Sequence, residues 1–373
     1  MCISKVLFEN DPQRLVVACQ EQEQRFGRAF SILEEGVRQR AFPGAAVAVS
    51  FQGRLIVHKA VGRFTYDPSS AAVQPDSIYD LASLTKVVAT TAAAMVLFER
   101  GRLDLETDLV RVIPEFGLSN DSRRKKVTLR MLLVHSSGLP AYARLFEQAT
   151  DPQALLRAAA ELLLEADPGA RTAYSDPGFI LLGEALQRVA GESLDAFCRR
   201  EVWAPLGMER TRFCPPREWH GRIPPTEEDR SFRHRLIQGE VQDENAAVLG
   251  GVAGHAGVFA PALEVTAWAE CLLRGGTPLL QPATIDRFIA RQTNPRGSSR
   301  ALGWDTPSRP SQSGRYFSPR SYGHLGYAGT SLWIDPERKL SVTLLSNRTW
   351  PDRACQLIKQ FRPAFHDAVI EAL

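Results

Sequence analysis

The sequence predicts an α/β protein of the α+β kind, in which helices from both chain ends flank a mainly antiparallel sheet and a mostly helical second lobe is attached. Strand-like segments lie near both ends of the 373-residue chain. Amphipathic segments flank them, so the simplest arrangement pairs the terminal strands in one sheet. Between residue 103 and about 215, helical patterns alternate with Pro and Gly, which predicts the second lobe.

Length and segment order give the expected division of the chain. A chain of 373 residues can bury a large core and hold two subdomains. We expect residues 1–66 and 263–373 to form the sheet lobe, and residues 67–214 to form the helical lobe. Residues 215–262 are polar and then glycine-rich, and we expect them to be a loop insertion beside the site, since loops of this length are usually functional or mobile.

The elements of the sheet lobe follow from their hydrophobic periodicity. Apolar residues at three- and four-residue spacings predict helices over residues 11–40 and 352–372. Runs rich in β-branched and apolar residues predict two hairpins, with strands at 45–50 and 54–61, joined at Gln52-Gly53, and at 328–334 and 340–346.

The rest of the chain reads mainly as helices and loops. The predicted helices are 128–134, 152–165, 177–190, 194–202, 263–273 and 282–290. Residues 294–316 have the composition of a disordered loop.

Composition excludes several functional classes. The net charge of +3 is too small to indicate nucleic-acid binding, and the basic run at residues 123–126 is typical of a solvated loop. No segment has the character of a signal peptide or a membrane span. The six cysteines are scattered without metal or redox spacing, which favours free thiols in the cytoplasm. Neither a cofactor nor a metal is expected.

One segment, Asp80-Leu81-Ala82-Ser83-Leu84-Thr85-Lys86, combines chemistry with a core helix. The residues after Lys86 are apolar or small on every face up to Phe98, so this helix must be buried, and Gly101 stands where a helix stop is expected. Ser83 and Lys86 are three residues apart and share a helix face. A serine beside an amine at a helix N-terminus is typical of an activated nucleophile.

The Ser-x-x-Lys pattern has a second match and a purely structural interpretation. Ser122-Arg123-Arg124-Lys125 has the same spacing, but it lies in a charged stretch with no apolar continuation. A buried, hydrogen-bonded serine would also explain Ser83 without catalysis. Context favours Ser83 over Ser122, because only Ser83 begins a core helix.

Several ordered motifs together resemble the serine β-lactamase and penicillin-binding protein family, with a pattern similar to class C β-lactamases and related esterases and D-amino-acid peptidases. The motifs are Ser83-Leu84-Thr85-Lys86, the segment 127–139, Pro168-Gly169 before Tyr174-Ser175-Asp176, and His324-Leu325-Gly326. The resemblance extends over residues 44–346 and implies the β-lactamase/transpeptidase-like fold. Residues 239–246 also resemble bacterial serine hydrolases of cell-wall metabolism.

The resemblance implies a role for each matching residue. Ser83 would attack a carbonyl and carry the acyl group, and either Lys86 or Tyr174 would be the general base. His324 matches the Lys or His of the family's Lys-Thr-Gly element on a strand edge, with Gly326 completing that motif. His255-Ala256-Gly257 has the same spacing, but no strand is expected after it, so His255 is expected only to line the site or to be structural. The family's oxyanion hole would be formed by the backbone N–H groups of Ser83 and Tyr327.

Two residues depart from the class C pattern. Asp176 stands where class C enzymes have Asn, and a carboxylate beside Lys86 should hold the amine protonated. This would shift the general-base role to Tyr174, with Lys86 stabilising the ionised phenol. His324 replaces a lysine, and a neutral imidazole binds anions less well than an ammonium.

The sequence therefore predicts a serine hydrolase that acts through an acyl-enzyme on a small ester, or on amide bonds of D-amino-acid, cell-wall-like fragments. One alternative is a true class C β-lactamase or a D-Ala-D-Ala carboxypeptidase. Another is a binding or sensor module that is acylated without turnover. The expected partner is a small-molecule substrate, with neither nucleic acid nor membrane, and the oligomeric state is open.

Overall fold

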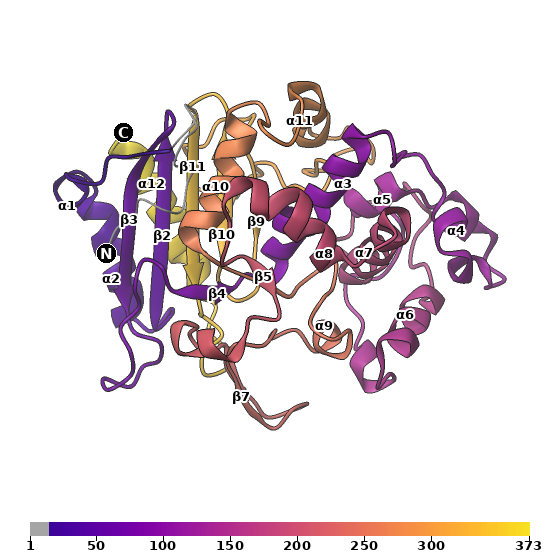
Figure 1. Cartoon of the computed structure of the whole chain (residues 1–373), viewed down its shortest axis with the longest axis horizontal. Coiled ribbons are helices and arrows are strands. Elements are labelled where there is room, and N and C mark those ends of the chain that lie inside the picture. The colour runs from indigo at the N-terminus through magenta and orange to yellow at the C-terminus, as the bar shows by residue number, and fades with distance from the viewer. Residues whose placement is uncertain (1–14) are drawn as a thin grey trace.

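A six-stranded sheet forms one side of the molecule in the computed structural model, which describes residues 15–373 (Figure 1). Every neighbouring pair is antiparallel except β1 and β3. The two terminal hairpins meet where β2 pairs with β11, which confirms the predicted fold class. In spatial order the strands are β1 (Val16–Val17), β3 (Arg54–Gly62), β2 (Gly44–Phe51), β11 (Leu340–Ser346), β10 (Ser331–Asp335) and β9 (Tyr322–Leu325).

Helices cover both faces of this sheet. Figure 1 shows α2 (Gly27–Arg38) and α12 (Ile358–Glu371) on the outer face, and α10 (Ala262–Leu273) on the inner face. Successive residues of a strand point to opposite faces. In β2, Val47 therefore packs among the side chains of α2 and α12, while its neighbour Ala48 belongs to the inner core.

The first helix is shorter than the sequence predicts. A helix was expected over residues 11–40, but the chain forms β1, then α1 (Gln22–Arg25), and only then α2. Residues 11–14 lie outside the described residues. Val16 and Val17 pair in parallel with Arg54 and Leu55, so sheet pairing outweighs the local helical pattern.

A largely helical part of the molecule surrounds the segment that contains Ser83. This segment continues as a 3₁₀ turn (Ala82–Leu84), a π-helical stretch (Lys86–Thr90) and α3 (Thr91–Glu99). The stretch Ala82–Glu99 is apolar and long enough to cross a membrane, but 83% of it is buried inside the protein, as in a core helix. Around it lie α4 (Leu109–Val112), α5 (Leu129–Leu133), α6 (Pro152–Glu161), α7 (Asp176–Ala190), α8 (Leu194–Cys198) and α11 (Pro282–Ile289).

The segment 215–262 contains more regular structure than a loop insertion. It forms the small hairpin of β6 (Glu227–Asp229) and β7 (Arg235–Ile237), the helix α9 (Glu244–Val248), and β8 (Val258–Pro261). The expectation that no strand follows His255-Ala256-Gly257 is wrong, because β8 begins at Val258. β8 pairs with β4 (Ile78–Asp80) and β5 (Arg212–Phe213). A four-residue strand that ends in proline has no alternation of its own, so only these partners reveal it.

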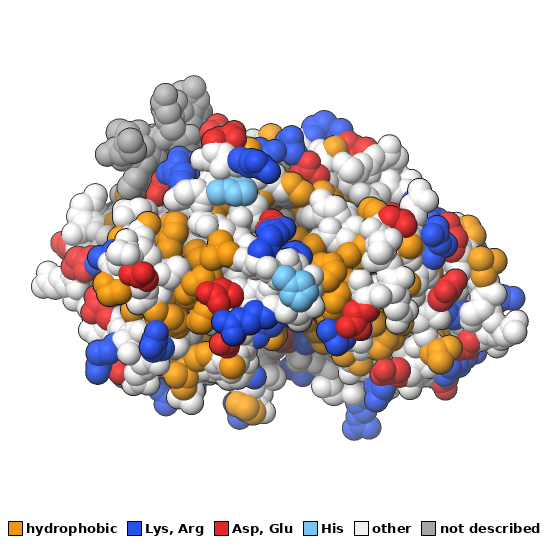
Figure 2. All heavy atoms as spheres, turned by 90° about the horizontal axis from the view of Figure 1, so that it is seen from below, with side chains coloured by type: hydrophobic (Ala, Val, Ile, Leu, Met, Phe, Trp, Pro, Cys, Tyr) orange, Lys and Arg blue, Asp and Glu red, His pale blue; other side chains and the backbone are white. Residues whose placement is uncertain are grey.

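Charged side chains of both signs are interspersed over the face seen in Figure 2, which is the lower side of the view in Figure 1. Neither sign dominates there. This distribution agrees with the small net charge of +3.

Candidate active site

The turn before Ser83 is held by the carboxylate of Asp80, at the end of β4. Asp80 accepts hydrogen bonds from the backbone N–H of Ala82 at 2.8 Å and of Gln242 at 2.8 Å. Ala82 has a φ of +48°, in the left-handed region that L side chains rarely adopt. Burial raises the pKa of Asp80 to about 6. Sequence reasoning missed Asp80, because its acceptor role depends on the distant residue Gln242.

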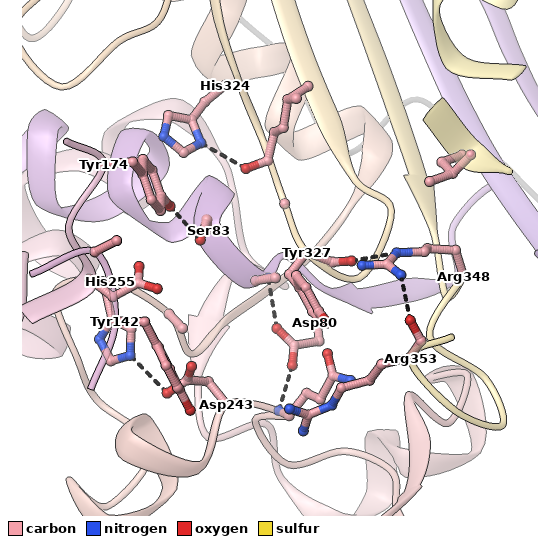
Figure 3. A pocket seen from close by; sticks show the side chains of 18 of the residues that line it. Asp80, Ser83, Tyr142, Tyr174, Asp243, His255, His324, Tyr327, Arg348 and Arg353 are labelled. Carbon is pink, nitrogen blue, oxygen red and sulfur yellow. Dashed lines mark hydrogen bonds and ion pairs between the residues drawn. The ribbon is translucent and has the colours of Figure 1, made fainter. Parts of the chain in front are cut away.

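The hydroxyl of Ser83 lies between an amine and a phenol, and Figure 3 shows the phenol of Tyr174 directed toward it. The Nζ of Lys86 donates to the Ser83 Oγ at 2.9 Å, and the Oη of Tyr174 donates to the same atom at 2.8 Å. The structure thus brings together three residues that are up to 91 positions apart in the chain.

The ammonium of Lys86 has two further acceptors. Its Nζ donates to the Oδ1 of Asp176 at 2.7 Å and to the backbone carbonyl of His255 at 3.0 Å. Burial alone would lower the pKa of Lys86, but Asp176 and Tyr174 outweigh burial and raise the pKa above its ordinary value. Lys86 is therefore protonated at neutral pH, as expected from Asp176.

The phenol of Tyr174 is also protonated at rest. Burial raises its pKa by more than the nearby ammonium of Lys86 lowers it. Lys86 does lower the pKa of the phenol, in the direction expected for a stabilising ammonium, but the low polarity of the buried site has the larger effect.

The ring of His135 packs against the ring of Tyr174, and the sequence had not singled out this histidine. Its ring lies 4.6 Å from the Tyr174 ring, centroid to centroid. Its Nδ1 accepts a hydrogen bond from the backbone N–H of Ser175 at 3.0 Å, as a neutral imidazole can. Burial lowers the pKa of His135 well below its ordinary value, which keeps the ring neutral.

His324 lies on the edge strand β9, beside Tyr174 (Figure 3). The two ring centroids are 6.0 Å apart. The Nδ1 of His324 donates to the carbonyl of Leu325 at 2.8 Å, and its Nε2 has no partner among the described residues. Burial, with Lys86 and Arg300 adding to it, lowers the pKa of His324 well below its ordinary value. The imidazole is therefore neutral, and its Nε2 is a buried hydrogen-bond acceptor without a partner among the described residues.

The turn after β9 requires glycine at position 326. A Cβ there would lie 1.9 Å from the Oγ1 of Thr330 and 2.5 Å from the carbonyl oxygen of Leu81. Thr330 also donates its hydroxyl to that carbonyl at 2.9 Å, so the turn is tied to the segment before Ser83. Outside helices and strands, the backbone hydrogen bonds of the described residues include none from the N–H of Ser83 or of Tyr327.

His255 lines the site through its backbone and its ring. Its carbonyl accepts from Lys86, and its Nε2 lies 2.8 Å from the Oδ1 of Asp243. Burial would raise the pKa of Asp243, but His255, the N–H of Ala246 and Lys86 lower it to about 2. Asp243 is therefore ionised, and it fixes the His255 ring beside the pocket. The sequence had not indicated Asp243.

These residues open onto a pocket of about 660 Å³. Ser83, Tyr174 and His324 lie in one part of its wall, together with Arg300, whose guanidinium carbon is 5.5 Å from the centre of the Tyr174 ring. Another part of the wall is formed by Arg348, Lys359 and Arg362.

Residues 15–373 hold no cluster of three or more His, Cys, Asp or Glu side chains that could bind a metal.

Comparisons with known proteins agree with this geometry. A family model described as Beta-lactamase matches residues 29–359. A protein of Escherichia coli (strain K12) named "Putative D-alanyl-D-alanine carboxypeptidase" is 30% identical over 347 residues, covering 82% of this chain and 79% of that protein. A protein of the same name from Salmonella agona (strain SL483) is 29% identical with the same coverage.

Solved structures show the same fold at lower identity. A penicillin-binding protein homologue from Caulobacter crescentus superposes with a TM-score of 0.76 at 21% identity, covering 95% of this chain and 99% of that one. EstCE1, a hydrolase with promiscuous acyltransferase activity, superposes with a TM-score of 0.75 at 22% identity, covering 92% of this chain and 99% of that one. The family model spans most of the chain and its match includes the Ser83 site, so the chain belongs to the Beta-lactamase family and is a serine hydrolase.

Proposed function

We propose that the protein hydrolyses small esters or amides of D-amino-acid, cell-wall-like compounds through a covalent acyl-enzyme on Ser83. One observation carries the proposal. The Ser83 Oγ accepts hydrogen bonds from Lys86 and Tyr174 at 2.9 and 2.8 Å, beside a pocket of about 660 Å³. A purely structural serine would not need two ionisable donors next to a cavity of substrate size.

In the proposed acylation step, the Ser83 Oγ attacks the substrate carbonyl carbon and its proton passes to the Lys86–Tyr174 pair. The N–H groups of Ser83 and Tyr327 bind the oxyanion, and one such donor typically contributes a factor of about 10²–10³ in rate. When the tetrahedral intermediate collapses, Tyr174 donates a proton to the leaving oxygen or nitrogen. Water then hydrolyses the acyl-serine by the same steps in reverse order.

The pair can accept the proton of Ser83 only after it has lost one of its own. Both partners have raised pKa values, so the reactive form carries one proton fewer than the resting form. The loss belongs to the coupled pair and not to either residue alone. We therefore propose that kcat/KM rises on the alkaline side of neutral pH.

The character of the pocket supports esters and D-amino-acid amides over penicillins. His324 is neutral, so it lacks the positive charge with which a lysine at this position would attract a carboxylate next to the scissile bond. Substrates held by hydrogen bonds to the free Nε2 fit this residue better.

The second candidate is a D-Ala-D-Ala carboxypeptidase. Its support is the name of the relatives that are 29–30% identical over 347 residues. Turnover of p-nitrophenyl acetate, nitrocefin and a D-Ala-D-Ala peptide would separate an esterase, a β-lactamase and a carboxypeptidase.

Intact-protein mass spectrometry tests the proposal directly. The protein is exposed to a fluorophosphonate, a penicillin and a D-Ala-D-Ala peptide, and we expect a mass increase equal to the phosphonyl or acyl group. The increase should disappear in Ser83→Ala and persist in Ser122→Ala, which removes the serine of the second Ser-x-x-Lys match. Labelling that survives in Ser83→Ala would refute the assignment. Labelling by penicillin without steady-state hydrolysis of any substrate would favour the sensor alternative.

We also propose a reducing, cytoplasmic location. The five cysteines among the described residues are free, and two of them, Cys198 and Cys271, are buried. Burial raises the pKa of both buried thiols, which makes them unreactive. Fractionation of the native host with an antibody checks the location.

A further inference from the structure

The wall of the pocket next to α12 contains a buried arginine without an acidic partner. Arg362 is only 4% exposed, yet no carboxylate of residues 15–373 forms an ion pair with it. Its guanidinium donates to the Oε1 of Gln312 at 3.1 Å and to the carbonyl of Thr330 at 3.5 Å. Its Nε has no acceptor among the described residues. Burying a charged group without an oppositely charged partner lowers the stability of the folded protein.

A second arginine increases the positive charge at the same place. Arg348 follows β11, is also 4% exposed, and lies over the ring of Tyr327 at 4.4 Å (Figure 3). Within residues 15–373 it donates only to backbone carbonyls, those of Tyr327, Arg353 and Cys355. Burial and the nearby charge of Arg348 together lower the pKa of Arg362 to about 9, so the guanidinium of Arg362 remains charged at neutral pH.

The other arginine in this part of the wall is already neutralised. Arg353 forms ion pairs with Glu227 and Glu244 at 2.6 and 2.8 Å. Lys359 also lines the pocket and lies on α12, one helical turn before Arg362. No carboxylate of the described residues lies within 4.0 Å of its amine. The uncompensated positive charge is therefore confined to Arg348, Lys359 and Arg362.

We propose that Arg362 and Arg348 form a subsite for a carboxylate of the substrate, away from the bond that Ser83 attacks. The pocket that contains Ser83 is also lined by both arginines, so one molecule can reach both places. A guanidinium binds a carboxylate through charge-assisted hydrogen bonds, and no carboxylate of the described residues already pairs with Arg362 or Arg348. This inference rests on the proposed hydrolysis at Ser83 and narrows its substrates to those that carry an anionic group at a distance from the scissile bond.

Matched pairs of esters test the subsite. On the acyl side, kcat/KM is compared between the p-nitrophenyl half esters of adipate and suberate and the corresponding mixed methyl p-nitrophenyl diesters, which lack the charge. On the leaving-group side, 4-acetoxybenzoate is compared with its methyl ester. We expect kcat/KM to favour the carboxylate by about tenfold or more in at least one pair, and the preference to disappear in Arg362→Gln. Arg362→Lys should keep part of it, because it retains the charge.

Arg315→Gln is the matched control. Arg315 contributes the same charge and pairs with Asp367 of α12, but it is largely exposed and does not line the pocket. The variant should keep the full preference for the carboxylate. Equal kcat/KM within every pair in the wild type would overturn the subsite while leaving hydrolysis intact. Absence of hydrolysis of the uncharged esters would instead contradict the proposed function.

A binding measurement keeps the subsite testable without turnover. Isothermal titration calorimetry measures the binding of adipate to Ser83→Ala and to the double variant that also carries Arg362→Gln. We expect adipate to bind the double variant at least tenfold more weakly. Unchanged affinity would overturn the subsite. If the glutamine variant does not fold, Arg348→Gln and Arg362→Lys provide the same comparison, and the ester pairs in the wild type need no variant at Arg362.

Discussion

Asp176 controls the proton affinity of the site. Its Oδ1 lies 2.7 Å from the Nζ of Lys86, and its negative charge raises the pKa of both Lys86 and Tyr174. The class C pattern has a neutral Asn here. The aspartate therefore delays the loss of the proton that the catalytic pair must release before it can act as a base.

Replacing Asp176 by Asn should move the alkaline rise of kcat/KM to lower pH by about one to three units, because a carboxylate beside a cation typically shifts its pKa by that amount. The sign follows from the direction of both shifts, since the aspartate raises both pKa values and its removal lowers them. The pH–rate profile with p-nitrophenyl acetate measures the change.

A control for this prediction lies on the same helix. Glu184 of α7 pairs with Arg188 and does not line the pocket, so Glu184→Gln should leave the profile in place. An unchanged profile in Asp176→Asn would contradict the role given to the aspartate.

At the scale of single residues, the sequence could predict those that lie in short motifs. Ser83 and Lys86 are one helical turn apart, so local spacing was enough to pair them. Asp80 also accepts from Gln242 and Asp243 contacts His255, and no short motif indicates these two contacts. The stabilising effect of Lys86 on ionised Tyr174 follows from the neighbouring charge, whereas the larger, opposing effect of burial on the pKa of Tyr174 is not visible in the sequence.

Among the elements, the turn between β9 and β10 has the tightest packing constraint near the nucleophile. Gly326→Ala places a Cβ against the Oγ1 of Thr330 and the carbonyl of Leu81. The turn must then move, and the N–H of Tyr327 moves with it. We expect kcat/KM to fall by about 100-fold or more, the usual effect of losing an oxyanion donor.

Gly27→Ala serves as the comparison, since a Cβ at that position meets no atom within 4 Å. It should leave kcat/KM and the melting temperature close to wild type. Steady-state kinetics and thermal unfolding of both variants check the prediction, which would be contradicted by a fully active Gly326→Ala.

Elements with strong local signals were predicted well. The hairpin of β2 and β3 turns at Gln52 and Gly53, whose positive φ values suit a two-residue turn, and α7 begins and ends within one residue of the prediction. The basic run at residues 123–126 was expected to be solvated, yet Arg124 is buried and donates to the carbonyls of Phe116, Ala160 and Leu162. Those carbonyls lie on segments that only tertiary folding brings near.

The molecule as a whole buries ionisable groups whose effects on stability oppose each other. Burial lowers the pKa of His366 to about 3, from 6.5. Below pH 6.5 the unfolded chain therefore binds a proton that the folded chain does not, and the free energy of unfolding falls by about 1.4 kcal/mol per pH unit from this group. Glu264 acts in the opposite direction, because burial raises its pKa to about 7 and stability is lost as pH rises from 4.5 to 7.

Two variants separate these effects. The destabilisation caused by His366→Gln should shrink as pH falls from 7 to 4.5, and the destabilisation caused by Glu264→Gln should shrink as pH rises over the same range. Urea unfolding at several pH values measures both. Parallel pH dependence of the two variants and the wild type would contradict the assignment of these buried groups.

The three hydrogen bonds of Lys86 have a consequence for inhibitor design. An ammonium has three N–H donors, and here they are engaged by Ser83, Asp176 and the carbonyl of His255. An inhibitor that directs an acceptor toward this amine must displace one of those partners and should gain little affinity. By contrast, His324 and Arg362, which also line the pocket, each keep a ring or guanidinium nitrogen without a hydrogen-bond partner among the described residues, so a compound directed at them has no such partner to displace.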